Sequence, residues 1–432
     1  MSGKGLKVAV VGGGIVGVSN ALALQKAGHQ VTLIDRRAPG RETSYGNAGV
    51  LSESSVGVLN SPGLLKLLPK LLLGKSNSVR FSPTFVLRRL GWMLSFLSYC
   101  TRRRWHAAGH ALRALQVISL DQHKAWIAEA GVNNLLRYGG WMKVFRRGES
   151  YEAYKAELEL ADEVGTEYSI FDREQIRQIE PGLKPIYEKA VLYDNTCGVS
   201  NPAALTDAYV RLFTEAGGTV LQASVTGLSR DAGAWHVAFA DRDSLDADGI
   251  VIAAGPWSSE IAGWLGYDLP LAWERGYHMH LEPGEGPQLN RAVHDVDGGF
   301  AIVPMQQGVR ITTGVEIAAR DAPPNYSQVT RSVELARDGH EMKGEIDETP
   351  WMGRRPTMVD SLPVIGPAPR HDRLWFNFGH QHIGLSMGPG SGLAIAAMIA
   401  GEAPPIDMAP FRPTRFSICP LAPGLDGADQ RR

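Results

Sequence analysis

The chain has 432 residues, of which 44% are hydrophobic and 21% are charged, a composition typical of a globular protein with more than one compact core. Its 44 Lys and Arg balance 45 Asp and Glu, which argues against a nucleic-acid partner because no polycationic field is present. Cys100, Cys197 and Cys419 are too few and too widely spaced for a disulfide framework or a CxxC metal site. We therefore expect a reducing, cytoplasmic location.

The first predicted unit is a strand, a glycine-rich turn and a helix. Residues 7–11 form a β-branched apolar run that predicts a strand rather than a signal peptide, because glycines interrupt it at once. Glycines 12–14 and Gly17 follow, and residues 18–27 favour a helix that ends at Gly28. A second strand is expected over residues 30–34. This order is that of a mononucleotide-binding βαβ unit.

The spacing of the glycines indicates an adenine dinucleotide. Gly12 permits the tight turn, Gly14 lets the backbone approach a pyrophosphate, and Gly17 allows the helix to pack closely on the strand. Asp35, 23 residues after Gly12, would accept hydrogen bonds from a ribose diol. A glycine-rich turn in an unrelated α/β fold is the alternative.

Three later segments decide between a flavin and a nicotinamide cofactor. Residues 42–49 and 254–257 are loops of small residues, the second at the end of a strand predicted over 249–254. After a strand at Leu374–Phe378, residues 388–392 predict a glycine-rich loop that opens a helix over 393–399. The positive end of that helix would face the electron-rich side of a flavin ring, which favours FAD.

Taken together, these motifs resemble the FAD-dependent D-amino acid oxidase and dehydrogenase family over about residues 7–416. The resemblance is greatest to the small subunit of bacterial D-amino acid dehydrogenase, and residues 274–278 look like members that act on D-proline or hydroxy-D-proline. The motifs that carry it are Val10-Val11-Gly12-Gly13-Gly14-Ile15-Val16-Gly17 with Asp35, Thr43-Ser44 with Asn47-Ala48-Gly49, Ala254-Gly255-Pro256-Trp257, Gly353-Arg354-Arg355-Pro356, and Gly379-His380 with Gly392.

The resemblance implies an α/β protein in which a Rossmann-like FAD-binding domain packs on an α+β substrate domain built on a large antiparallel sheet. We assign residues 1–60, 195–270 and 350–416 to the first domain, 61–194 and 271–349 to the second, and 417–432 to a loose tail. The residues expected to bind FAD are Gly12, Gly14, Ile15, Val16, Gly17, Asp35, Arg36, Ser44, Asn47, Ala48, Gly49, Val225, Ala254, Gly255, Gly384 and Gly392.

A substrate with a carboxylate needs a fixed cation, and arginine offers a planar fork that lysine lacks. Arg355 falls where the family motif Gly-x-Arg-Pro has its carboxylate-binding arginine, whereas Arg354 is expected to be structural. Tyr277 lies on an alternating strand and either bonds the substrate carboxylate or packs in the core with its hydroxyl satisfied. His380 either contacts flavin or substrate or fixes its loop.

Other side chains are candidates for the same site. Arg275 shares the face of Tyr277 and would pair with an acid, and Tyr45 is a further pocket candidate. His278 and His280, with His380 and His382, resemble two halves of a metal site, but no acidic cluster or Cys pair accompanies them, so we expect no metal.

The chemistry implied by the family is hydride transfer from the substrate Cα to flavin N5. The imino acid formed hydrolyses to a 2-oxo acid and ammonia, or stays a pyrroline carboxylate when the substrate is of the D-proline type. Three alternatives stay open: oxidation of sarcosine, glycine or another imino acid, a non-catalytic or sensor flavoprotein subunit, and a nicotinamide dehydrogenase.

The electron acceptor implied by the family is oxygen or a quinone. Residues 63–73 and 90–100 are apolar with basic flanks, the second running into Arg102-Arg103-Arg104. Neither reaches the roughly 18 to 20 apolar residues that span a bilayer. They predict either peripheral attachment to the inner face of the cell membrane or core-packed helices with solvated arginines.

Overall fold

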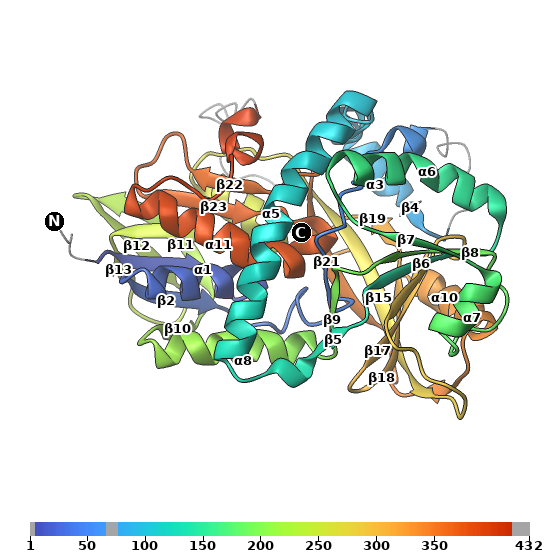
Figure 1. Ribbon diagram of the computed structural model, residues 1–432. Coiled ribbons are helices and arrows are strands. Elements are labelled where there is room, and N and C mark those ends of the chain that lie inside the picture. Colours follow the sequence, from blue (N-terminus) through green and yellow to red (C-terminus); the bar gives the residue numbers. More distant parts are fainter. Residues whose placement is uncertain (1–4, 66–76, 417–432) are drawn as a thin grey trace.

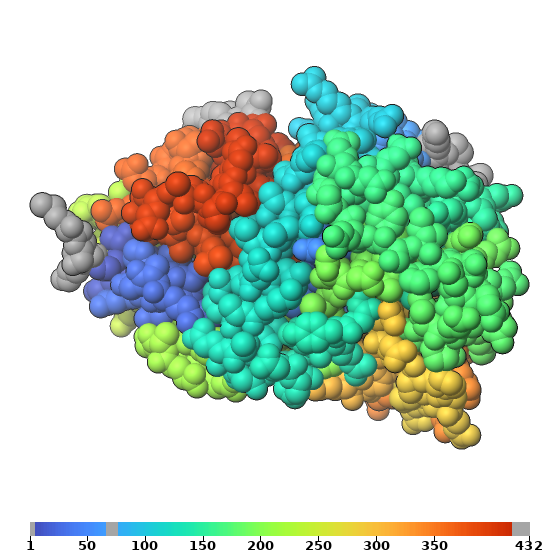
Figure 2. Space-filling model, viewed as in Figure 1, coloured from blue at the N-terminus to red at the C-terminus, as the bar shows by residue number. Residues whose placement is uncertain are grey.

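The computed structural model describes residues 5–65 and 77–416, and its strands form two main sheets that lie side by side (Figure 1). The predicted tail at 417–432 and most of the apolar segment at 63–73 lie outside the described residues. The long helix α5 (Arg102–Glu129) runs across the molecule where the halves meet, as its cyan surface in Figure 2 shows.

The first sheet has six strands. β1 and β2 are its first strands along the chain, and β1 pairs in parallel with both β2 and β14, so it lies in the middle of the sheet. Four of the five residues of β1 and all four of β14 are buried, which explains their unbroken apolar sequences. In spatial order the strands are β10 (Thr219–Gln222), β2 (Gln30–Asp35), β1 (Lys7–Val11), β14 (Gly249–Ile252), β23 (Leu374–Phe378) and β22 (Val364–Pro367), of which only β22 is antiparallel to its neighbour.

Helices cover one face of this sheet and a β-meander packs with the other. α1 (Ile15–Lys26) packs on α11 (Gly384–Ala400), and both lie in one apolar core with α5 and α8 (Pro202–Glu215). The meander consists of β11 (Val225–Asp231), β12 (Ala234–Phe239) and β13 (Leu245–Ala247).

The glycine-rich segment at 388–392 is helix, not the loop that the sequence predicted. α11 begins at Gly384 and carries this segment in its interior, with Pro389 inside the helix. A Cβ on Gly388 would lie 3.0 Å from the Ser19 hydroxyl, and one on Gly392 would lie 2.8 Å from the Ser19 carbonyl. The small residues therefore let α11 lie against α1, and close packing overrides their low helix propensity.

The second sheet has eleven strands and is mostly antiparallel, with parallel pairs only at β16·β6 and β19·β4. β15 is its longest strand and pairs with four others. Along the sheet the order is β4 (Val79–Phe81), β19 (Val315–Ile317), β15 (Leu271–Pro283), β18 (Gly308–Thr313), β17 (Phe300–Met305), β16 (Ala292–Asp295), β6 (Trp141–Phe145), β8 (Lys189–Tyr193) and β7 (Ser169–Asp172), with β20 (Met342–Glu345) and β21 (Trp351–Met358) also on β15.

The remaining elements are short or peripheral. The other helices are α3 (Pro83–Arg88), α4 (Leu90–Ser98), α6 (Gly148–Glu163), α7 (Arg173–Ile179), α9 (Ser258–Trp264) and α10 (Ser327–Gly339), with 3₁₀ turns η1 (Asn133–Leu135), η2 (Gly255–Trp257), η3 (Gln381–Ile383), η4 (Ala409–Phe411) and η5 (Pro413–Arg415). A third small sheet joins β3 (Val50–Leu51), β9 (Cys197–Val199) and β5 (Leu136–Tyr138).

The predicted fold class is confirmed, because a parallel Rossmann-like sheet stands beside a large, mostly antiparallel one. The strands of the first sheet all fall in the segments predicted for the FAD-binding domain. β21 and α5 do not follow that division. β21 falls in the predicted FAD-binding domain but pairs with β15 of the second sheet, and α5 falls in the predicted substrate domain but packs on α11. The domain boundaries themselves stay a prediction.

Among the described residues, one helical stretch, Gln381–Ala400, is apolar and long enough to cross a membrane by length and composition. Two thirds of its apolar window is buried inside the fold (67%), as in a core helix.

Candidate functional site

A cavity of about 750 Å³ is lined by residues of both large sheets. Its lining begins at Gly12 and Asp35 of the first sheet and reaches Arg355 on β21 and Lys143 on β6 of the second. The cavity therefore joins the predicted dinucleotide motif to the predicted substrate residues.

The first end of the cavity is shaped by three glycines. Gly12 has φ +113°, and a Cβ there would lie 2.5 Å from the Ala253 carbonyl, so only glycine fits. The α-carbon of Gly17 lies against the Gly12 carbonyl, so a side chain at this position would not fit. Gly14 differs, because a Cβ there would meet only the Ser44 hydroxyl, at 3.3 Å. The space over Gly14, at the N-terminus of α1, is open to an anion.

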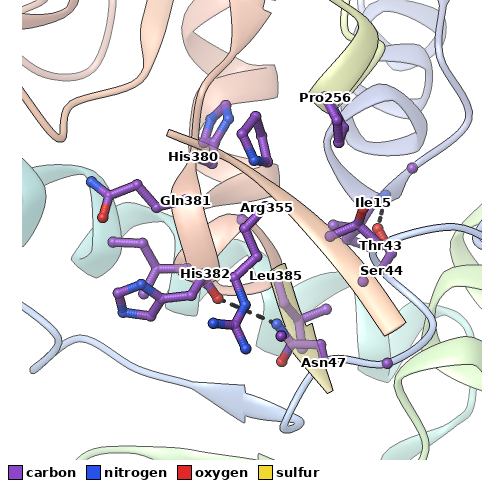
Figure 3. A pocket seen from close by; sticks show the side chains of 18 of the residues that line it. Ile15, Thr43, Ser44, Asn47, Pro256, Arg355, His380, Gln381, His382 and Leu385 are labelled. Atoms are coloured by element: carbon purple, nitrogen blue, oxygen red, sulfur yellow. Dashed lines mark hydrogen bonds between the residues drawn. The ribbon is translucent and has the colours of Figure 1, made fainter. Parts of the chain in front are cut away.

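Polar groups extend this end of the site. The Ser44 hydroxyl accepts a hydrogen bond from Ile15 N at 2.9 Å and so ties the 42–49 loop to α1 (Figure 3). Asp35 accepts from Gly13 N at 2.6 Å and from Arg37 N at 2.9 Å. Burial raises the pKa of Asp35, while these two backbone donors oppose the rise.

Most residues predicted to bind FAD line this cavity. The exceptions are Gly17, Gly49 and Gly392, which pack against backbone: Gly49, at φ +66°, lies on the Val199 carbonyl, and Gly392 lies on Ser19. Those that line it are Gly12, Gly14, Ile15, Val16, Asp35, Arg36, Ser44, Asn47, Ala48, Val225, Ala254, Gly255 and Gly384. The role of each residue stays a prediction.

The second end of the cavity holds Arg355. Its side chain is half-buried, and within the described chain its guanidinium makes one hydrogen bond, from Nη1 to the Gly314 carbonyl at 3.3 Å. Gly276 leaves the space that the guanidinium fills. Figure 3 shows the side chain pointing past His382 toward Asn47. A half-buried arginine with donors to spare is suited to bind a carboxylate.

His380 and His382 accompany Arg355. Burial lowers the pKa of His380 to about 3, whereas the side chain of His382 is exposed. Both line the cavity, and the Nε2 atom of His380 has no hydrogen-bond partner in the described structure. The site thus offers a neutral lone pair beside the arginine.

The Tyr277 hydroxyl is bonded to protein groups and not free for a substrate carboxylate. Tyr277 lines the cavity, but its hydroxyl donates to Glu316 at 2.6 Å and accepts from Asn325 N at 3.1 Å. The side chain belongs to the apolar core on the other side of β15, with Met279 and Leu281. This favours the alternative of a core tyrosine with a satisfied hydroxyl. As predicted, Arg275 pairs with an acid, which is Glu316 at 2.7 Å.

Among the cavity residues that the sequence did not predict are three on neighbouring strands of the second sheet. Trp141 and Lys143 alternate on β6, and His294 on β16 stacks on Trp141 with ring centroids 5.9 Å apart. Lys143 is paired with Glu157 at 2.7 Å. The alternating sequence of β6 was the available signal, because alternation places Trp141 and Lys143 on one face.

A second cavity of about 580 Å³ lies behind Trp351. Trp351 lines both cavities and stacks on His278, with ring centroids 4.8 Å apart. Its indole lies over Gly46 and Gly353, where no side chain would fit. Tyr45, predicted to line the substrate pocket, lines this second cavity instead.

His278, His280 and Asp347 form the group within the described residues whose ligand atoms approach as a metal site would, all within 4.8 Å. The Nε2 atom of His280 accepts from Arg310 at 3.0 Å, so Nδ1 carries the proton and donates to Asp347 at 2.8 Å. A metal on Nδ1 would require an imidazolate. The chain Asp347–His280–Arg310 instead holds the Asn47 carbonyl, to which Arg310 donates at 2.5 Å.

Comparisons with known proteins agree with this architecture. Residues 7–398 match the protein family described as FAD dependent oxidoreductase. The chain belongs to that family. Its cofactor is FAD, as predicted, and the chain is an FAD-dependent oxidoreductase.

Relatives extend over the whole chain. A D-amino-acid oxidase of Bradyrhizobium diazoefficiens is 32% identical over 96% of this chain and 99% of its own length. A D-amino acid dehydrogenase of Agrobacterium fabrum is 30% identical over 95% of this chain and 100% of its own. The solved glycine oxidase of Geobacillus kaustophilus superposes with a TM-score of 0.74 at 20% identity over 96% of this chain and 100% of its own, a likeness of fold alone.

The residues of the first cavity end fit FAD. The open space over Gly14, the glycine cradle and the helix N-terminus suit a pyrophosphate, and Asp35 suits a ribose. The cavity continues past Ala254 and Gly384 to Arg355, so a ring system bound between them would meet the substrate residues. The D-proline type of substrate stays a prediction.

Proposed function

We propose that the protein is a D-amino acid dehydrogenase that oxidises the bond between Cα and the amine nitrogen. The observation that carries the proposal is Arg355, a half-buried cation at the cavity end opposite the dinucleotide motif with donors free for a carboxylate. Full-length relatives named D-amino-acid oxidase and D-amino acid dehydrogenase support it. FAD, when bound, supplies the two-electron acceptor.

The residues of the chain orient the substrate rather than attack it. Arg355 fixes the carboxylate, and with that group held the Cα hydrogen is directed along the cavity toward Gly384 and Ala254. His380 is buried and neutral, so it accepts a hydrogen bond from the amine without repelling it. Loss of the Cα hydrogen with two electrons leaves an imino acid, which water converts to a 2-oxo acid and ammonia.

The test uses flavin-loaded protein without oxygen. Each D-amino acid, including D-proline and 4-hydroxy-D-proline, is added in turn, and loss of the visible flavin absorbance is recorded. D-amino acids are expected to bleach the flavin, and the matching L-enantiomers are expected to leave it oxidised. Bleaching by sarcosine or glycine alone would move the assignment to those amines, and a flavin that no amine reduces would favour a non-catalytic subunit.

We propose further that α3 and α4 attach the protein to an anionic membrane, where a quinone would be the electron acceptor. Leu87 on α3 and Leu90 and Leu94 on α4 are 80%, 54% and 60% exposed, and the four-residue spacing of Leu90 and Leu94 places these two on one side of α4. Residues 54–120 contain ten Lys and Arg and no Asp or Glu, so the surroundings of these leucines are basic.

A flotation assay with vesicles tests this attachment. The protein is expected to float with vesicles that contain anionic lipid and to stay behind with zwitterionic ones. Replacing Leu87, Leu90 and Leu94 together by Gln should abolish flotation while flavin content is retained. Equal flotation of the triple variant would contradict the proposal.

A further inference from the structure

One buried acid beside the substrate site has no charged partner at ion-pair distance. Glu274 on β15 is buried, and neither carboxyl oxygen makes a hydrogen bond by distance in the described structure. The Thr357 hydroxyl, which also has no hydrogen-bond partner there, acts on Glu274 and holds its pKa down against the effect of burial. Buried carboxyl groups without a cation are rare in folded proteins, because burial without compensation is unfavourable. Its position therefore needs an explanation that packing alone does not give.

The strand register places Glu274 directly opposite Arg355. The two residues pair across β15 and β21, so both side chains project from the same face. Their charges interact, although no ion pair within 4.0 Å forms between them. Arg355 lines the substrate cavity and Glu274 does not, so Glu274 acts on a substrate only through Arg355.

The other charged side chains near Glu274 and Arg355 have partners of their own. Arg354 donates to the Arg320 carbonyl, Glu316 is held by Arg275, and Arg310 is bonded to His280 and Asn47. Burial lowers the pKa of His380 to about 3, so it stays neutral near pH 7. The strands that pair with β15 carry these charged side chains: Arg310 on β18, Glu316 on β19, Lys343 and Glu345 on β20, and Arg354 and Arg355 on β21. Arg80 lies on the neighbouring β4, His380 precedes η3 and His382 lies in it.

We propose that Glu274 is the counter-ion of Arg355 in the empty site and takes up a proton when a carboxylate occupies that arginine. This inference rests on the proposed binding of the substrate carboxylate by Arg355. The bound carboxylate neutralises the guanidinium and adds a second negative charge nearby, so an ionised Glu274 would be left buried without a cation. A proton from solvent binds to its carboxylate oxygen and restores neutrality.

The pH dependence follows from the direction of this change. Burial raises the pKa of Glu274 and the charge of Arg355 opposes the rise, so engaging Arg355 raises the pKa further. Between the pKa of the free site and that of the occupied site, binding takes up one proton, and Kd increases up to tenfold per pH unit. Below both values and above both values, Kd is independent of pH.

Calorimetry of benzoate binding to the flavin-loaded protein measures the proton directly. Benzoate keeps one charge throughout the neutral range and is not oxidised, so the measurement does not depend on turnover. Titrations in two buffers with different ionisation enthalpies give the number of protons taken up. We expect a fraction of a proton, up to one, at the pH of steepest dependence, and none for Glu274→Gln, with tighter binding at high pH.

Two control variants separate the outcomes. Arg355→Ala should abolish benzoate binding, and Glu316→Gln, a buried acid that faces Arg275 instead, should keep the proton uptake. An absence of uptake in the wild type, or equal uptake in Glu274→Gln, would overturn the inference. Because the wild type alone gives a proton count, a poorly folded variant does not remove the test. Failure of D-amino acids to bleach the flavin would instead overturn the proposed function.

Discussion

Replacing Arg355 by alanine is the sharpest test of the substrate site. Each hydrogen bond from a charged donor contributes about 1.5–3 kcal/mol, and the free donors of Arg355 allow two to one carboxylate. Because water enters the space left by the side chain, we expect the lower part of this range, about 3–4 kcal/mol in all. At 1.4 kcal/mol per tenfold change, kcat/KM falls about 10²- to 10³-fold.

The assay is anaerobic flavin reduction by the best D-amino acid, followed over a range of concentrations. Arg354→Ala is the matched control, because its guanidinium donates to the Arg320 carbonyl and does not line the cavity. Flavin content must be equal in the three proteins, since loss of Arg355 leaves Glu274 without its cation. Wild-type kcat/KM in Arg355→Ala would refute the assignment of the carboxylate to this residue.

Three further predictions concern the cofactor, the second cavity and stability. Gly14→Ala should fold but bind FAD at least tenfold more weakly, because its methyl group enters the space over the turn, whereas a fluorescence titration showing wild-type affinity would contradict this. Trp351→Ala should join the two cavities and lower KM for bulky D-amino acids relative to D-alanine, and an unchanged ratio would show that Trp351 is no partition. His123, held neutral between the Tyr209 hydroxyl and the Leu385 carbonyl, has its pKa lowered from 6.5 to about 4 by burial. The unfolded chain therefore binds this proton first, so the free energy of unfolding falls by up to about 3 kcal/mol as pH drops from about 6.5 to about 4. Urea unfolding of His123→Gln should show a drop smaller by that amount, and an identical pH dependence would contradict the assignment.

The local elements of the dinucleotide unit could be predicted because short-range sequence determines them. β1 and β23 have the predicted bounds, and Gly28, with φ +88°, follows α1 as expected. α11 could not be predicted to begin at Gly384, because its glycines and proline are poor helix formers and only the distant surface of α1 explains them.

The sequence predicted many residues of the site, but not the groups that these residues contact. The alternation of β15 placed Tyr277 and Arg275 correctly on one face, but the acid that binds both lies on β19. Likewise, Tyr45 was predicted to line the substrate pocket but lies in the second cavity, a position set by Trp351. Pairings between strands far apart in sequence decide such contacts, and no local pattern encodes them.

The order of strands in the first sheet bears on how the protein is made. β14 lies between β1 and β23, and Leu374 follows Val11 by 363 residues. At about 5–20 residues per second, a ribosome needs roughly 20–70 s to synthesise that stretch. Throughout this time the glycine turn has α1 beside it but lacks β23 and α11. Flavin loading is therefore a late event in biosynthesis. Until β23 is made, the nascent chain carries an open apolar sheet edge to which chaperones can bind.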